Sequence, residues 1–203
     1  MRNIYLIRHG ETTWNSTSRL QGTTDVELSE NGLRQAQKLA ERLAGNKFAA
    51  VYASDLKRAA ATAGLIAEKH GLTIMLEPLF REMSFGEWEG LDVDTINKKW
   101  PGQLRNLFEN ANGFKIPGGE GFDNLRRRVS GAFQAMVDRH GAGEDVAVVA
   151  HGGTIRAIIG NVLNLQAATV WRFRLDNAGI SILSTFADRF SISLLNDTNH
   201  LSV

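Results

Sequence analysis

The sequence predicts an α/β protein of three layers, in which a mostly parallel sheet with an antiparallel edge strand carries helices on both faces. Two patterns predict this fold. Up to residue 78, short apolar runs alternate with amphipathic stretches of helical period, which is typical of parallel strands joined by crossover helices. Near the C-terminus, residues 180–183 and 190–194 are two strand-like runs around a turn at 187–189, which predicts a hairpin at the sheet edge.

The first elements follow from apolar period and capping residues. Residues 4–7 predict a buried strand that stops at Gly10, and the polar residues 14–25 predict a loop over the sheet edge. Ser29 is a predicted N-cap, with Leu28 and Leu33 spaced to form a hydrophobic staple across it. The helix that follows should end near Gly45 and bury one face, which consists of Leu33, Ala36, Leu39, Ala40 and Leu43.

The alternation continues through the second and third strands. Residues 49–53 predict the second strand, Ser54 caps the next helix, and Gly71 ends it. Ala63, Ile66 and Ala67 should face inward from that helix. Residues 73–76 predict a third strand, closed by Pro78. Later in the chain, helices at 125–140 and 154–163 flank another apolar strand, residues 146–150.

Residues 80–121 break this alternation with seven glycines, two prolines and short helical pieces. A segment of this length is too long for a tight connection between a helix and a strand, so it predicts a lid or substrate-binding insertion within one domain spanning residues 1–203. We expect its large apolar side chains to form a small core of their own rather than a pocket wall; these are Phe80, Met83, Phe85, Trp88, Trp100 and Phe108. If some lined the pocket, an aromatic or apolar leaving group would suit it better than a small triose.

Composition excludes several classes of function. The chain has 23 basic and 22 acidic side chains, and this balance predicts no nucleic-acid or membrane partner. The absence of cysteine excludes disulfides, thiolate zinc sites and cysteine nucleophiles. The apolar run at 4–7 is too short for a signal peptide or membrane span, so a cytoplasmic location is expected. No two histidines have the i,i+4 spacing of a helical metal site, and no metal is expected. The sequence does not predict an oligomeric state.

Two histidines follow predicted strands. Arg8 and His9 come directly after the first strand, and His151 follows the apolar run at 146–150. The carboxyl ends of parallel strands form the ligand-binding edge of an open α/β sheet, so both histidines could meet there. Arginine binds phosphate or carboxylate oxygens through its planar fork, and histidine serves as a nucleophile or an acid near neutral pH. The alternative for Arg8 and His9 alone is a strand that simply runs into a polar turn.

The ordered set Arg8-His9-Gly10-Glu11-Thr12 and His151-Gly152-Gly153 resembles the histidine phosphatase superfamily, whose fold is called phosphoglycerate mutase-like. The resemblance extends over nearly the whole chain, and it is strongest to the α-ribazole phosphatase and broad-specificity phosphatase branch. It implies that His9 is the nucleophile, that Arg8 holds the phosphoryl group, and that His151 with Gly152 binds its oxygens.

The same resemblance implies further site residues. Arg58, in Ser54-Asp55-Leu56-Lys57-Arg58, matches the second arginine motif of the family, although alone it would be read as a solvated helix arginine. Glu82 matches the acid of the phosphatase branch, with Glu87 and Glu89 as competing carboxylates. Asn15, Gln21 and Gly22 match auxiliary phosphate contacts. Gly121 departs from the family pattern, because many members carry serine there, and no hydroxyl contact is expected from it.

The resulting hypothesis is a metal-independent phosphomonoesterase that works through a phosphohistidine and needs no cofactor. Its partner would be a small-molecule phosphomonoester such as α-ribazole 5′-phosphate. One alternative is a cofactor-dependent phosphoglycerate mutase, which uses the same pocket but generally has a longer insertion after the acid glutamate. An alternative of another class is a phospho-ligand binding module without turnover. The presence of the full set Arg8, His9, Arg58, Glu82 and His151 favours an enzyme.

Overall fold

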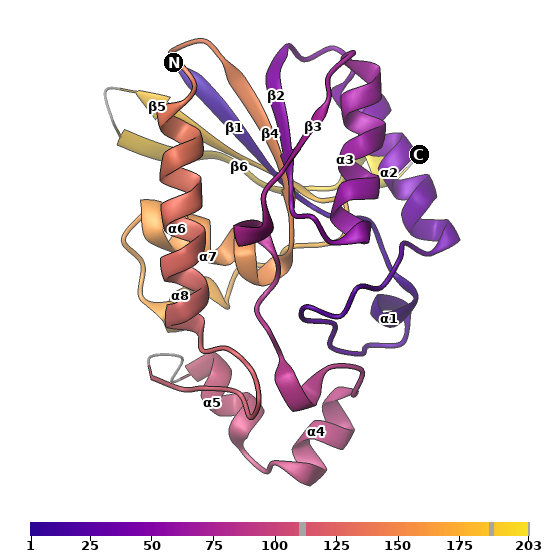
Figure 1. Ribbon diagram of the computed structural model, residues 1–203, viewed down its shortest axis with the longest axis vertical. Helices are drawn as coiled ribbons and strands as arrows, with labels where there is room; N and C mark the ends of the chain where they lie inside the picture. The colour runs from indigo at the N-terminus through magenta and orange to yellow at the C-terminus, as the bar shows by residue number, and fades with distance from the viewer. Residues whose placement is uncertain (110–112, 187–188, 203) are drawn as a thin grey trace.

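The computed structural model describes residues 1–109, 113–186 and 189–202. Within these ranges six strands form one sheet in the order β3-β2-β4-β1-β5-β6 (Figure 1). The strands are β1 (Arg2–Arg8), β2 (Phe48–Ala53), β3 (Ile74–Leu76), β4 (Asp145–Ala150), β5 (Ile180–Phe186) and β6 (Arg189–Asp197). The first four are mutually parallel, and β5 pairs antiparallel with both β1 and β6. The predicted sheet and its antiparallel edge are confirmed, whereas the predicted turn at 187–189 falls mainly outside the described residues.

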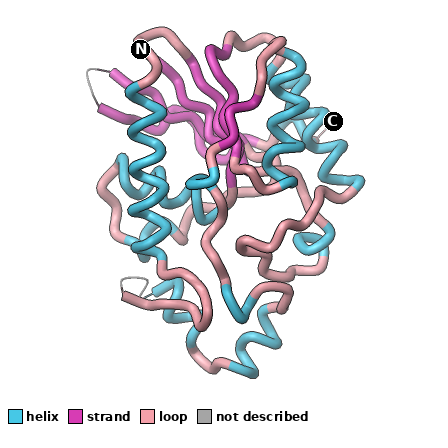
Figure 2. Tube along the Cα trace, in the orientation of Figure 1, coloured by secondary structure: helices cyan, strands magenta, loops and turns pink. Residues whose placement is uncertain are grey.

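Helices cover both faces of the sheet, as the tube view also shows (Figure 2). On one face lie α2 (Glu30–Leu43) and α3 (Lys57–Lys69), and on the other α6 (Phe122–Asp138) and α7 (Gly152–Val162). The short helices are α1 (Thr13–Ser16), α4 (Val93–Lys99), α5 (Gln103–Glu109) and α8 (Ala167–Val170), and the 3-10 turns are η1 (Pro78–Phe80), η2 (Gly86–Trp88) and η3 (Asn199–Leu201).

The alternation of side chains along each strand divides the interior into two cores. In β1, Ile4 and Leu6 pack into the core under α6 and α7, whereas Tyr5 and Ile7 pack into the core under α2 and α3. Strand neighbours in register follow the same division, since Tyr5 pairs with Ala147 and Leu6 with Val148. A central strand that is apolar on both faces is expected of a parallel sheet covered on both sides. The three-layer prediction is therefore confirmed.

Several local predictions hold and others are wrong. Ser29 caps α2, because its side chain accepts a hydrogen bond from the Gly32 amide. Leu33, however, is 45% exposed and does not belong to the buried face of that helix. Ser54 is not the cap of α3: its hydroxyl accepts from the Leu56 amide in a tight turn, and Leu56 is the capping residue.

Two further boundaries differ from the prediction. The segment 14–25, predicted as a loop, overlaps α1, whose N-terminus Thr12 and Asn15 cap reciprocally. Helix α7 begins at Gly152 rather than at 154, so His151 is its N-cap residue. At α7 the chain turns into a helix almost directly after β4, whose last residue is Ala150, so the first amides of the helix lie at the sheet edge. No helix in the described part of the chain is long and apolar enough to cross a membrane.

The large side chains of segment 80–121 do not form a separate core. Phe80, Met83 and Trp88 are completely buried and belong to the same cluster as residues of α6 and α7. Trp88 lies 6.2 Å from Trp100 between ring centroids. The expectation of a small independent core was wrong because these side chains pack into the core between the sheet and helices α6 and α7. Helices α4 and α5 lie at the bottom of the view in Figure 1, away from the sheet.

Candidate active site

The candidate site lies at the carboxyl ends of the adjacent strands β1, β4 and β2. Arg8 pairs with Ala150 in the β1–β4 register, so His9 and His151, the next residues, stand side by side. The His9 amide donates to the Ala150 carbonyl, and the two imidazole rings are 5.1 Å apart between centroids. Arg58 enters from the first turn of α3, which follows β2. The topology thus brings together groups that are far apart in the sequence.

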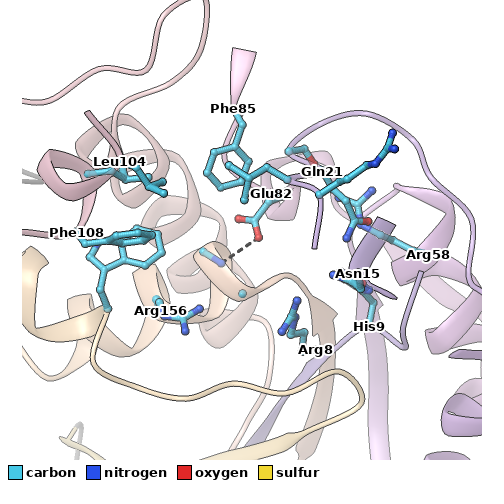
Figure 3. Close-up of a pocket in the computed structure, with 17 residues that line it drawn as sticks. Arg8, His9, Asn15, Gln21, Arg58, Glu82, Phe85, Leu104, Phe108 and Arg156 are labelled. Atoms are coloured by element: carbon cyan, nitrogen blue, oxygen red, sulfur yellow. Dashed lines mark hydrogen bonds between the residues drawn. The ribbon is translucent and has the colours of Figure 1, made fainter. Parts of the chain in front are cut away.

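Arg8, His9 and Arg58 line a cavity of about 400 Å³ (Figure 3). Of the residues that the sequence motifs singled out, the lining contains Arg8, His9, Asn15, Gln21, Gly22, Arg58, Glu82 and Gly152. His151 is completely buried behind this surface, next to His9. In Figure 3 the side chains of Arg8, Asn15, Arg58 and Glu82 surround one space. The structure therefore gathers all nine of these residues at one place, and their roles stay a prediction.

Hydrogen bonds assign opposite tautomers to the two histidines. Nδ1 of His9 lies 2.7 Å from the Gly10 carbonyl oxygen, which only accepts, so Nδ1 carries the proton and Nε2 has a free lone pair. Nδ1 of His151 is the acceptor of a 3.3 Å bond from Nε of Arg58, so in the neutral ring the proton lies on Nε2. This Nε2–H is buried and has no partner among the described residues. His9 thus presents a lone pair at Nε2, and His151 presents an N–H donor there.

The environment keeps both rings neutral. Burial lowers the pKa of His9 well below its ordinary value, and the guanidinium groups of Arg58 and Arg8 lower it further. The bond to Gly10 opposes this shift only in part. Burial also lowers the pKa of His151, with Arg58 as the next cause. A neutral imidazole is the form that can act as a nucleophile, so the arginines that would hold an anion also keep His9 in its reactive state.

The two arginines are held by backbone carbonyls. Arg58 donates to the carbonyls of Gly22 and Thr24 at 2.7 and 2.8 Å, and Arg8 donates to that of Leu175 at 2.7 Å. Burial lowers the pKa of Arg58 to about 10, which leaves it a cation at neutral pH. Nε of Arg8 is buried without a partner in the described ranges. Two desolvated cations with a spare donor suit a dianion such as a phosphate ester.

Neighbouring polar groups position the loop between β1 and α2. The Asn15 side-chain oxygen accepts from the Thr12 amide and from Nδ2 of Asn177, and Asn177 also donates to the His9 carbonyl. Oε1 of Gln21 is buried and unpaired in the described structure. Gly22 has φ +58°, and a Cβ there would collide with the Glu89 carboxylate and the Phe85 amide. A glycine is therefore required where this loop passes the site.

The three carboxylates of segment 80–121 have different places. Glu82 lines the cavity, with Oε2 accepting from the Gly153 amide at 3.0 Å and Oε1 from the Met83 amide at 2.8 Å. Glu89 instead accepts from the amides of Thr23, Thr24 and Phe85, and it supports the loop. Glu87 is exposed and is not part of the lining. Of the three, Glu82 alone borders the cavity.

A profile of the histidine phosphatase superfamily (branch 1) matches residues 4–198. The chain belongs to this superfamily. Phosphoserine phosphatase 1 of Hydrogenobacter thermophilus is 34% identical to it, over 99% of this chain and 95% of that protein. Phosphoglycerate mutase-like protein 4 of Arabidopsis thaliana is 38% identical, over 98% of this chain and 86% of that protein.

Solved structures of histidine phosphatases share the fold. Mycobacterial glucosyl-3-phosphoglycerate phosphatase has a TM-score of 0.90 at 31% identity, covering 98% of this chain and 100% of that one. A putative α-ribazole-5′-P phosphatase from Escherichia coli has a TM-score of 0.86 at 28% identity, covering 97% of this chain and 96% of that one. The predicted resemblance to the phosphatase branch is confirmed. These relatives support a phosphomonoesterase over the mutase alternative.

The structure of this histidine phosphatase also shows pocket residues that the sequence reasoning missed. Arg156 and Trp171 line the cavity, and so do Leu104, Leu107 and Arg19. Phe85 and Phe108 do as well, so the expectation that the large side chains of segment 80–121 avoid the pocket wall was wrong for these two. One signal was present for Arg156: it lies four residues after Gly152, and residues at i and i+4 share a helix face.

Proposed function

We propose that this protein hydrolyses phosphomonoesters through a covalent phosphohistidine at His9. One observation carries the proposal: the unpaired buried groups around the cavity match the needs of a phosphoryl group. Nε of Arg8 and Nε2–H of His151 are both donors, as phosphoryl oxygens require, and each is buried without a partner in the described residues. Because buried polar groups are nearly always hydrogen-bonded, such a set points to an absent polar ligand.

In the first step, Nε2 of neutral His9 attacks phosphorus in line with the ester oxygen. The P–O bond breaks, and its electron pair leaves on the alcohol oxygen. Arg8, Arg58 and the Nε2–H of His151 offset the charge on the phosphoryl oxygens as they move through the transition state. The two arginines already hold their positions through carbonyl bonds, so little reorganisation is needed when the substrate arrives.

Glu82 is proposed as the general acid and base. In its acid form it gives a proton to the departing alcohol oxygen. In the second step its carboxylate takes a proton from water, whose oxygen attacks the phosphohistidine and releases phosphate and neutral His9. The supporting observation is position: Glu82 borders the cavity, whereas Glu87 and Glu89 do not. Its contacts with the amides of Gly153 and Met83 hold the carboxyl group at this border.

The substrate is proposed to be a small phosphomonoester, with α-ribazole 5′-phosphate as one candidate. Segment 80–121 is proposed as a substrate-binding insertion in a single domain. Support for this comes from Glu82, Phe85, Leu104, Leu107 and Phe108, which all belong to that segment and line the cavity. They place an apolar surface beside the acid, which favours a leaving group with an apolar part. A binding module without turnover would not need a general acid there.

The covalent step can be tested by rapid quench with a ³²P-labelled phosphomonoester. Wild type is expected to retain label that is stable in base and labile in acid, and peptide mapping should place it on His9. His9→Ala should retain none and lose turnover. His70→Gln removes a histidine outside the cavity lining and serves as the matched control. Turnover by His9→Ala at a rate near that of wild type would show that the covalent mechanism is wrong.

A further inference from the structure

Arg156 is a partly buried cation at the cavity that the proposed chemistry does not use. It belongs to the second turn of α7 and lines the cavity. Its Nη2 donates to the Phe173 carbonyl at 2.6 Å, and its guanidinium carbon lies 5.4 Å from the centroid of Trp171. Its Nε is buried and has no partner in the described structure. The guanidinium is thus fixed in place with a donor to spare.

Arg156 meets the proposed catalytic groups at Gly152. A Cβ built on Gly152 would lie 3.0 Å from Nη1 of Arg156, 3.8 Å from Nε of Arg8 and 3.9 Å from Oε2 of Glu82. These three groups therefore border one small space. Figure 3 shows Arg156 between Arg8 and the apolar side chains of α5. If Glu82 acts on the ester oxygen, Arg156 would lie beside the first carbon atoms of the leaving alcohol.

The wall beyond Arg156 is apolar. Phe108 packs edge-on against Trp171 with 5.2 Å between ring centroids, and Phe122 lies 5.4 Å from the same indole. Leu104, Leu107 and Phe85 complete this side of the lining. Burial lowers the pKa of Arg156, with Glu82 as an opposing influence. A cation placed at the border between an apolar wall and a phosphate site is costly unless it binds an anion.

We infer that Arg156 binds a carboxylate on the leaving alcohol, and that the preferred substrates are phosphomonoesters of hydroxy acids. The inference rests on the proposed function and names the substrate class. One nitrogen of the guanidinium is taken by Phe173, and the remaining donors suit a planar, two-oxygen acceptor. A carboxylate two carbons from the ester oxygen reaches Arg156 while the phosphoryl group stays on Arg8 and Arg58. The rest of the alcohol would lie against Trp171 and Phe108.

A matched pair of substrates isolates this contact. 3-Phosphoglycerate and glycerol 3-phosphate differ in one group, a carboxylate against a hydroxymethyl. Wild type is expected to have the higher kcat/KM for 3-phosphoglycerate. Arg156→Gln should lower that value about 10- to 100-fold, the range for one charge-assisted contact, and change the value for glycerol 3-phosphate less than about threefold. Arg156→Lys should retain part of the preference, because it keeps the charge but not the fork.

The control removes the same charge nearby without touching the cavity. Arg172 is exposed, follows Trp171 and is not part of the lining, so Arg172→Gln should change neither value appreciably. Equal losses for both substrates in Arg156→Gln would indicate a purely structural role and overturn the inference. If that variant does not fold, wild type still decides, since equal kcat/KM for the two substrates would also overturn it. Failure of wild type to hydrolyse either substrate or p-nitrophenyl phosphate would instead contradict the proposed function.

Discussion

The substitution Gly153→Ala should displace the proposed acid, Glu82, and leave the other groups of the site in place. Gly153 lies in the first turn of α7, and its amide donates to Oε2 of Glu82 at 3.0 Å. A Cβ on this residue would lie closer than 3.0 Å to Oε1 of Glu82, and at 3.4 Å from Cδ2 of Leu125. Because the carboxylate is the far end of a flexible side chain, it should move while the helix stays in place. The methyl group therefore displaces the acid and leaves His9 and Arg58 undisturbed.

The expected magnitude follows from the lost contacts. Complete loss of a general acid costs about 10²- to 10⁴-fold in rate, and Glu82→Gln should fall in this range for substrates with poor leaving groups. A displaced acid keeps part of its effect, so Gly153→Ala should lose about 10- to 100-fold on the same substrates. Stability should change little: alanine gains up to about 1 kcal/mol over glycine in a helix, which offsets the weakened bonds to Glu82.

The assay is kcat/KM across a leaving-group series, with urea unfolding as a parallel measurement. p-Nitrophenyl phosphate needs no proton on its leaving group, so both variants should retain most of the wild-type phosphorylation rate on it. Gly131→Ala in α6 is the matched control, because nothing lies within 4 Å of a Cβ there. It should be more stable by about 0.4–1 kcal/mol and fully active. Equal losses for good and poor leaving groups in Gly153→Ala would refute the reasoning.

Two other outcomes are expected. The pKa values of His9 and His151 are lowered by burial, so the folded protein binds fewer protons than the unfolded chain below pH 6.5, and stability should fall as the pH is lowered. Each ring should lower the free energy of unfolding by up to about 1.4 kcal/mol at pH 5.5. Urea unfolding at pH 7.5 and 5.5 should therefore show a smaller loss of stability in His151→Gln than in wild type. Identical losses in the two proteins would contradict a lowered pKa for His151. With 3-phosphoglycerate and added 2,3-bisphosphoglycerate, phosphate release should outpace isomerisation in phosphorus NMR. The reason is that segment 80–121 is shorter than the insertion expected of a mutase, so water is expected to reach the proposed phosphohistidine. Faster isomerisation would favour a mutase.

The three layers and the antiparallel edge of the sheet could be predicted because they depend on patterns within each element and on their alternation along the chain. The runs that form β1, β2 and β4 are almost continuously apolar, as expected of strands buried on both faces. The rule that crossovers between parallel strands are right-handed limits how such strands can be connected. Ser54 shows where such reasoning stops. Its hydroxyl has the chemistry of a cap, but α3 starts later because the Lys57 amide donates to the Asp25 carboxylate. That contact joins residues 32 positions apart and has no local signature.

The residues of the candidate site likewise include some whose position the sequence could predict and others whose position it could not. His9, His151 and Arg58 follow strands, so their convergence could be predicted from the topology of a parallel sheet. Trp171 could not, because it reaches the cavity from α8 and the loop after it, through packing on Phe122 and Phe108. Some large side chains of segment 80–121 line the cavity and others are buried in the core, and only tertiary packing decides which do which.

Glu89 connects the two halves of the site. It was weighed as a rival acid, yet its oxygens accept from the amides of Thr23 and Thr24, and from that of Phe85 on the cavity wall. The same loop offers the carbonyls of Gly22 and Thr24 to Arg58. One carboxylate thus connects the segment that carries Glu82 to the loop that holds Arg58. The proposed acid and the proposed phosphate site therefore share this support, and a change at Glu89 should disturb both together.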